Sequence, residues 1–178
     1  LALAEHGRRP LVELDAAEAA RNRCEAWQPL AARRGITLVA LVPEKPRPVR
    51  LVATALEQIL DALISNALKF TPAGGRVEIT VNPDNPTTIA VRDTGPGIPP
   101  HQRALATGRF WRAPNAQNVD GAGLGLPIVA VLAEASGARF ALDPSPGGGL
   151  TASLTTAVPA VATTGHTSAP PPAPRETD

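Results

Sequence analysis

The stretch LVATALEQILDALISNALKFTPAGGRVEITVNPDNPTTIAVRD, residues 51–93, contains the patterns that decide the fold. Residues 51–70 repeat apolar side chains at intervals of three and four, which predicts a helix with one buried face. In residues 77–81, apolar side chains alternate with polar ones, which predicts a half-buried strand, and a second strand follows at 88–93. Because turn residues rather than a helix join these strands, the sheet should be mixed, with helices on one face.

The flanking sequence extends this pattern on both sides. Asp15 and Glu18 have the spacing of a capping box at the start of an Ala-rich helix, and Gly35 is typical of a helix end. Glycine- and proline-rich residues 94–122 form a long break before the last helix. The fold class that we predict is α+β, a two-layer sandwich with a mixed sheet of about five strands and three main helices on one face. The elements predicted outside 51–93 are strands at 11–14, 36–42, 139–142 and 150–155 and helices at 16–34 and 124–135.

Composition and charge narrow the function classes. The chain has 178 residues, with 17 Lys and Arg against 16 Asp and Glu and a net charge of +1, so it lacks the strongly basic balance of a nucleic-acid-binding protein. Its one cysteine excludes an intrachain disulfide and a cysteine-based zinc site. No run of about 18 apolar residues occurs, so we expect no membrane-spanning helix in this sequence. Met is absent, including at position 1, so we expect a fragment of a longer chain.

Four clusters carry candidate chemistry, and the first lies on the predicted helix 51–70. Asn66 and Lys69 are three residues apart, so they lie on one side of that helix. A carboxamide oxygen suits Mg²⁺, which commonly shares its ligands with substrate phosphates, and a lysine ammonium suits the phosphate itself. Taken alone, the pair is explained more simply as a solvated polar face.

The second cluster is Asp93-Thr-Gly-Pro-Gly97, which follows directly on a predicted strand. A carboxylate fixed at a strand end can accept a hydrogen bond from an exocyclic amine. Gly95 and Gly97 allow the backbone to approach a flat ring or to bend sharply. An ordinary turn after a strand explains the same residues equally well.

The third and fourth clusters lie in and after the long break at 94–122. Arg109-Phe-Trp-Arg112 combines an aromatic side chain that can anchor a loop with arginines that can bind phosphate. Gly121-Ala-Gly-Leu-Gly125 precedes an apolar helix, and free N–H groups at a helix start suit an anion. The glycine spacing matches neither a dinucleotide-binding loop nor a Walker A loop, and a flexible hinge explains it equally well.

The fixed order of these clusters is more specific than any one of them. Together they resemble the ATP-binding catalytic domain of bacterial sensor histidine kinases, in the wider group that includes gyrase, mismatch-repair and chaperone ATPases. The resemblance covers about residues 11–157, which we assign as the catalytic domain, and residues 1–10 are expected to be the end of a preceding dimerisation helix or a linker. Residues 158–178, rich in Pro, Ala and Thr, are predicted to be a disordered tail. The segments that look like the family's N, G1, F and G2 boxes are residues 65–72, 93–99, 109–112 and 121–126.

The resemblance implies ATP and Mg²⁺ as cofactors and gives each cluster a role. Asn66 becomes the Mg²⁺ ligand, and Lys69 and Arg112 become the catalytic residues that act on the phosphates. Asp93 binds the adenine amino group, and residues 94–122 form a mobile lid over the nucleotide. The implied nucleotide-binding residues are Asn66, Lys69, Asp93, Gly95, Gly97, Ile98, Phe110, Gly121, Gly123, Leu124, Gly125 and Leu126.

The chain departs from the family pattern at three positions. Ala62 stands where the N box usually begins with Asn, Thr107 where the F box begins with Phe, and Ala122 where the G2 box commonly has Thr. These changes leave open a non-catalytic module that binds a nucleotide or a partner. An ATPase of the gyrase or chaperone kind is a further alternative, but it needs a catalytic Glu near the metal ligand, where this chain has Asp61 and Ala62.

By the resemblance, the function is to bind Mg-ATP and to transfer its γ-phosphoryl group to a histidine in two-component signal transduction, as a protein-histidine kinase. The acceptor is expected on a separate dimerisation domain of the same protein, because none of His6, His101 and His166 fits the family's phosphoacceptor site. A response regulator receiver domain is the second implied partner, and nucleic acid is not one. We expect a monomeric fragment of a homodimeric protein, in the cytoplasm, whose parent can carry a membrane anchor as many relatives do.

Overall fold

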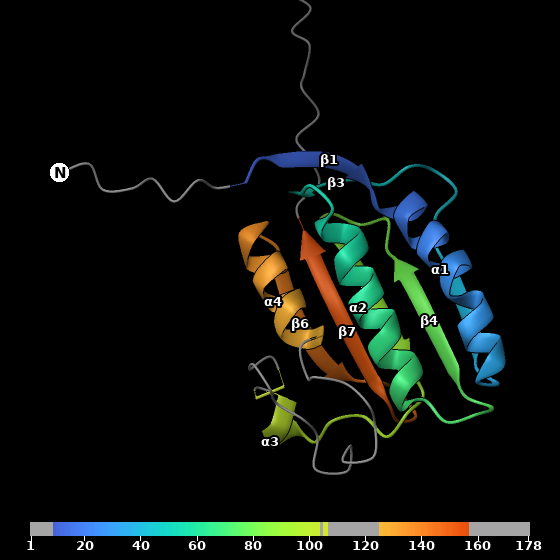
Figure 1. Ribbon diagram of the computed structural model, residues 1–178. Coiled ribbons are helices and arrows are strands. Elements are labelled where there is room, and N and C mark those ends of the chain that lie inside the picture. The colour runs from blue at the N-terminus through green and yellow to red at the C-terminus, as the bar shows by residue number, and fades with distance from the viewer. Residues whose placement is uncertain (1–8, 104, 107–124, 157–178) are drawn as a thin grey trace, which may run out of the picture.

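The computed structural model describes residues 9–103, 105–106 and 125–156, and it confirms the predicted fold class. Figure 1 shows two layers, with α1, α2 and α4 lying side by side over one face of a five-stranded sheet. The elements are β1 (Leu11–Asp15), α1 (Ala16–Arg33), β2 (Thr37–Leu41), β3 (Pro48–Val52), α2 (Ala55–Phe70), β4 (Arg76–Val81), β5 (Thr87–Asp93), α3 (Pro100–Arg103), α4 (Gly125–Ala135), β6 (Arg139–Pro144) and β7 (Leu150–Thr156).

The main sheet is mixed, as its turn-connected strands predict. Its strand order is β2-β4-β5-β7-β6, in which β2 and β4 are parallel and every other pair is antiparallel. β5 is therefore the central strand, and it ends at Asp93 opposite Val77 of β4. This position places the Asp93 carboxyl group at the end of a strand that has a neighbouring strand on each side, rather than in an exposed loop.

A second, two-stranded sheet corrects the sequence prediction at residues 48–54. The predicted helix 51–70 begins only at Ala55, because residues 48–52 form β3 and pair antiparallel with β1. Leu51 is fully buried in that ribbon, and Thr54 takes a left-handed φ of 64°, which separates the strand from the helix. The apolar residues 51 and 52 match the helical pattern equally well, so only the pairing partner decides their structure.

The apolar stripe of α2 forms the centre of the core. Its residues Leu56, Ile59, Leu60 and Ile64 are at most 1% exposed, between the sheet and the flanking helices. Each such side chain contributes about 1.5–3 kcal/mol through burial. The polar residues Asn66 and Lys69 of the same helix lie outside this stripe and are half-buried.

α1 begins at its predicted cap. The Asp15 carboxylate accepts hydrogen bonds from the N–H groups of Ala17 (2.9 Å) and Arg47 (2.8 Å). The second bond also ties the start of α1 to the residue before β3. Over the ranges that the structure describes, no helix is both long enough and apolar enough to cross a membrane.

Candidate functional site

The centre of the candidate site is the carboxyl group of Asp93. The residue is 5% exposed, and its Oδ1 atom accepts hydrogen bonds from the N–H groups of Gly95 (2.8 Å) and Leu150 (3.2 Å). One donor comes from the turn after β5 and the other from the start of β7. The carboxyl group is therefore held from two sides, with both bonds on the same oxygen.

Burial raises the pKa of Asp93 above its ordinary value of 3.8, and the N–H groups of Gly95 and Leu150 only partly offset this rise. No charged side chain among the described residues is a cause of the shift. The ionised carboxylate is thus incompletely compensated by the protein. A ligand that donates a hydrogen bond to it gains from an acceptor that burial has already partly desolvated.

The glycines of the G1 segment are needed for packing of backbone on backbone. A Cβ atom on Gly95 would lie 2.8 Å from the Phe70 carbonyl oxygen, at the end of α2. Gly97 has a φ of +71°, and a Cβ there would lie 2.7 Å from the carbonyl oxygen of Gly149. Both glycines were expected to allow a close approach, and the structure shows that the approaching groups include the protein's own carbonyls.

The hairpin between β6 and β7 contributes to the site, which the sequence patterns did not predict. Gly149 has a φ of +94°, and a Cβ there would overlap the carbonyl oxygen of Asp93. The next residue, Leu150, donates its N–H to the Asp93 carboxylate. Three successive glycines at 147–149 are more than a simple hairpin turn needs, and this excess is the signal that could have identified the segment.

Asn66 and Lys69 lie on the last turns of α2, and both side chains are half-buried. The end of this helix reaches the Asp93 turn through the contact of Phe70 with Gly95. On the side of α4, Gly125 begins that helix near α2, and a Cβ on Gly125 would lie 3.9 Å from the Ala62 carbonyl oxygen. The structure thus connects the N-box helix to the G1 turn and to the last glycine of the G2 segment.

Two further residues of the expected set lie in the described part of the chain. Ile98 is half-buried against the core, and its carbonyl oxygen accepts a hydrogen bond from Arg103 Nε (3.0 Å). Leu126 is 6% exposed in the first turn of α4. The binding roles of all these residues stay predictions. The remaining members of the set lie outside the described ranges: Phe110, Arg112, Gly121, Gly123 and Leu124, together with the substituted positions Thr107 and Ala122.

Asp61, the acidic residue nearest to the N-box segment, is bound to α1. Its carboxylate accepts a hydrogen bond from Trp27 Nε1 (2.8 Å) and forms an ion pair with Arg23 (3.4 Å). α1 and α4 flank α2 on opposite sides (Figure 1). Asp61 therefore faces the flank of α2 away from α4.

The side chains in the described part of the site suit a metal ion that takes most of its ligands from a bound phosphate and water. The described residues hold no group of three or more His, Cys, Asp and Glu side chains that could bind a metal without other ligands. Mg²⁺ at phosphate sites typically takes only one or two protein oxygens and fills its shell with phosphate oxygens and water. The half-buried carboxamide of Asn66 fits that type of site.

The comparisons with known proteins identify the class. Residues 52–160, more than half of the chain, match the family described as histidine kinase-, DNA gyrase B-, and HSP90-like ATPase. Fold and site together define a domain of this ATPase class. The chain belongs to that family, and the predicted resemblance is confirmed at this level.

Similar proteins are named as sensor kinases. The signal transduction histidine-protein kinase/phosphatase MprB of Mycobacterium leprae (strain TN) is 43% identical over 79 residues, which cover 43% of this chain and 15% of that protein. A structure of the mycobacterial sensor histidine kinase MprB has a TM-score of 0.69 at 26% identity and covers 83% of this chain and 97% of that chain. Full-length ShkA in complex with AMPPNP has a TM-score of 0.72 at 30% identity, covering 85% of this chain and 32% of that chain.

The matched region is a minor part of the curated relatives. It spans 15%, 17% and 30% of the first three. The family and fold are therefore established for this chain, whereas the activity of a whole sensor kinase is a matter of proposal.

Proposed function

We propose that this chain is the ATP-binding catalytic domain of a two-component sensor histidine kinase. It binds Mg-ATP and presents the γ-phosphoryl group to a histidine on a separate dimerisation domain of the same protein. A response regulator receiver domain then accepts the phosphoryl group. The full-length protein acts as a homodimer with this domain in the cytoplasm, and the fragment is a monomer.

The observation that carries this proposal is the state of the Asp93 carboxylate. It is buried at the end of the central strand, and both of its described hydrogen bonds fall on Oδ1. The second oxygen can accept a hydrogen bond from the exocyclic amine of adenine, which guanine does not offer at the same position. Such a carboxylate selects for a ligand with a donor, because an unpaired buried acceptor is costly.

The phosphate end of the nucleotide is assigned to α2 and to the start of α4. Asn66 would hold Mg²⁺, which neutralises phosphate charge when bound, and Lys69 would donate to the phosphate oxygens. Arg112 and the glycines at 121, 123 and 125 are proposed to complete the phosphate site, with Phe110 anchoring the lid. Catalysis then depends on positioning and charge neutralisation, as is usual for phosphoryl transfer.

The surroundings of Asp61 support a kinase over a nucleotide-hydrolysing enzyme. A hydrolase of the gyrase kind needs a carboxylate free to act near the metal ligand. Here the nearest candidate, Asp61, is occupied by Trp27 and Arg23 of α1. The next residue, Ala62, offers no functional group. Water activation is therefore not the chemistry that this helix supports best.

A non-catalytic module remains the second candidate because of Ala62, which replaces an amide side chain on the N-box helix. Such a module could bind a nucleotide or a partner without transferring a phosphoryl group. It has no need for the Asn66 and Lys69 pair. The two candidates therefore differ in whether that pair makes binding depend on Mg²⁺.

Calorimetric titration of the chain with ADP and ATP, with and without Mg²⁺, tests the proposal. We expect binding that is strengthened by Mg²⁺, and loss of that Mg²⁺ effect in Asn66→Ala. The isolated chain should not label itself from γ-labelled ATP, and the parent protein's dimerisation domain, added in trans, should become labelled on histidine. No binding at millimolar nucleotide would overturn the proposal. Binding without any transfer to the histidine domain would favour the non-catalytic module.

A further inference from the structure

The hairpin loop at residues 145–149 extends past the end of the β5–β7 ladder. The last ladder pair joins Arg92 to Thr151, and the pairing ends there. One position further on, the Leu150 N–H donates to the side chain of Asp93. Leu150 begins β7, and the loop just before it makes no ladder pair with β5, so a different contact must hold that loop against the strand.

Hydrogen bonds within the loop join its residues to one another. A contact that fixes one residue of the loop therefore restrains the others. Ser145 donates its N–H to the Gly149 carbonyl (3.1 Å) and accepts on its own carbonyl from Gly148 N–H (3.1 Å). Its hydroxyl also lies 2.8 Å from the Thr151 hydroxyl. These bonds close the loop upon the start of β7.

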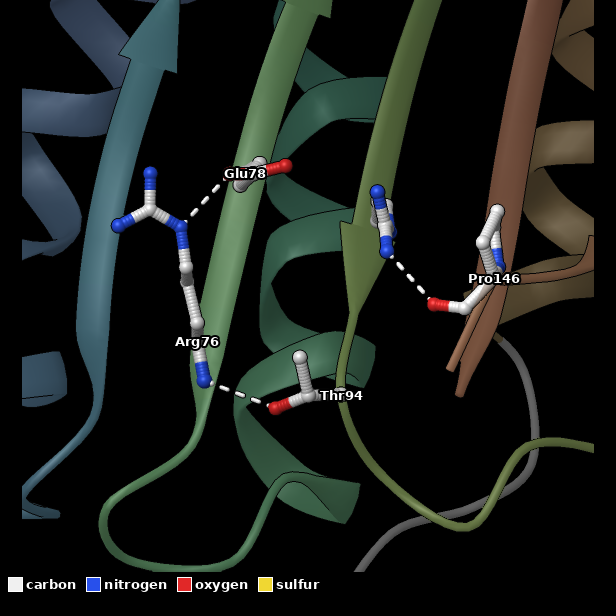
Figure 2. A network of polar contacts seen from close by, with 5 residues as sticks. Arg76, Glu78, Thr94 and Pro146 are labelled. Atoms are coloured by element: carbon white, nitrogen blue, oxygen red, sulfur yellow. Dashed lines mark hydrogen bonds and ion pairs between the residues drawn. The ribbon is translucent and has the colours of Figure 1, made fainter. Parts of the chain in front are cut away.

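Arg92 supplies the missing attachment. Its Nη2 atom donates a hydrogen bond to the carbonyl oxygen of Pro146, at 2.7 Å. Figure 2 shows Pro146 beside the end of β5, with the dashed line to the neighbouring strand. Successive residues of a strand point to opposite faces, so Arg92 reaches the loop from the open face while Asp93 meets Leu150 on the helix-covered face.

We propose that Arg92 is a positioning residue for the candidate site: by holding the Pro146 carbonyl, it keeps the hairpin loop against β5 and so keeps the Leu150 N–H on Asp93. The inference concerns this chain's own geometry, and only its consequence for ligand affinity rests on the proposed function. Gly149 reinforces the coupling, because its close approach to the Asp93 carbonyl leaves no room for the loop to shift toward the strand.

The type of residue matters to this role. Arg92 reaches a main-chain carbonyl with a fixed charge, and such charge-assisted hydrogen bonds are stronger than neutral ones. The bond is exposed to solvent, so its loss should loosen the loop rather than unfold the sheet. Lysine could donate one hydrogen bond to the same oxygen, and alanine could donate none.

The test compares Arg92→Ala and Arg92→Lys with the control Arg139→Ala. Arg139 is an exposed arginine on β6, paired with Thr155 at the end of the hairpin far from the loop. Its position in the register places it on the same open face as Arg92, so the control makes the same change of charge on that face. Thermal unfolding establishes that all three variants are folded.

Amide hydrogen exchange of the ligand-free protein is the first readout. We expect the Leu150 amide to exchange roughly threefold to tenfold faster in Arg92→Ala, with a smaller change in Arg92→Lys and none in Arg139→Ala. The amide of Ile79 in β4 should exchange at the wild-type rate throughout. Equal acceleration at Ile79 and Leu150 would mean general destabilisation and would overturn the positioning role.

Affinity for ADP is the second readout, measured by calorimetry on the same four proteins. We expect roughly threefold weaker binding in Arg92→Ala, partial recovery in Arg92→Lys and wild-type binding in Arg139→Ala. Unchanged ADP affinity in Arg92→Ala, in a wild type that binds ADP, would overturn the proposed effect on the site. If the wild type does not bind ADP, the proposed function fails, and the Leu150 exchange alone still decides whether Arg92 holds the loop.

Discussion

The α1 flank of α2 and the end of β5 hold their carboxylates in different ways. On the α1 flank, the side chains of Trp27 and Arg23 bind Asp61, whose side chain remains 38% exposed. At the end of β5, the partners of Asp93 within the described ranges are backbone N–H groups alone, and the residue is 5% exposed. A carboxylate matched by side chains of its own protein stabilises the fold. A more deeply buried one, with donors on a single oxygen, retains the capacity to bind a ligand.

The largest effect that would sharpen this comparison is expected for Asp93→Asn. The new amide can keep its oxygen toward Gly95 and Leu150 and then presents an NH₂ group, a donor, to the adenine amine. We expect ADP affinity to fall about 1000-fold, or roughly 4 kcal/mol, because two donors face each other. Calorimetry measures the affinity, and thermal unfolding should show no loss of stability. Wild-type affinity in this variant would contradict the assigned role.

The next effect concerns how closely the hairpin packs on Asp93. Gly149→Ala should destabilise the protein by about 3 kcal/mol, because its Cβ would overlap the Asp93 carbonyl and its φ is +94°. Gly147→Ala is the matched control: its φ is +84°, but no atom lies within 4 Å of a Cβ there. We expect the control to cost only about 1 kcal/mol, from backbone strain. Equal losses in denaturant unfolding would show that the overlap with Asp93 is relieved at no cost.

The pH dependence of binding separates the two carboxylates further. Burial raises the pKa of Asp93, so its favourable contribution to folding is fully present below its ordinary pKa of 3.8 and is lost as pH rises through the higher folded value. Ligand binding needs the ionised form, so ADP affinity should fall on acidification at a pH above 3.8, by at most about tenfold per pH unit.

Calorimetry in two buffers of different ionisation enthalpy checks this expectation, because acidic binding should release a proton. Asp61→Asn should keep the same profile. If ADP affinity stayed constant down to about pH 4, the ionised Asp93 would not be the group that binds the ligand.

The smallest effect is expected on the α1 flank of α2. Asp61→Ala removes the acceptor of the Trp27 indole and one partly exposed ion pair, so stability should fall by about 1 kcal/mol. ADP affinity should not change, because this side chain faces α1. A large loss of nucleotide binding with normal stability would show that Asp61 takes part in the phosphate site and would return the hydrolase alternative.

Much of the fold could be predicted because its signals are local. The apolar stripe of α2, the alternation in β4 and the cap at Asp15 each lie within a few residues of the feature that they predict, and the structure confirms them. β3 could not be predicted in this way. Leu51 pairs with Val12, although all of α1 and β2 lie between them in the sequence, and its own neighbours fit a helix equally well.

In the candidate site too, features with a local sequence signal could be predicted and contacts between distant residues could not. Asp93 could be identified because it follows a strand and precedes glycines in a familiar order. Its partner Leu150 lies 57 residues away in the sequence, and no local pattern indicates which amide will meet a given carboxylate. The occupied state of Asp61 likewise depends on α1, whose Trp27 is 34 residues distant.

The sequence by itself determined the class of fold, the order of the four clusters and the candidate residues for a nucleotide site. Short-range periodicity and the chemistry of single side chains are sufficient for these. Only the tertiary structure decided which donors hold Asp93, that Arg92 and Gly149 belong to the same unit, and that Asp61 serves the fold. These contacts depend on which distant segments the buried core brings together. Core formation is driven by the burial of apolar area, and no local sequence pattern indicates which polar groups from distant segments will then meet.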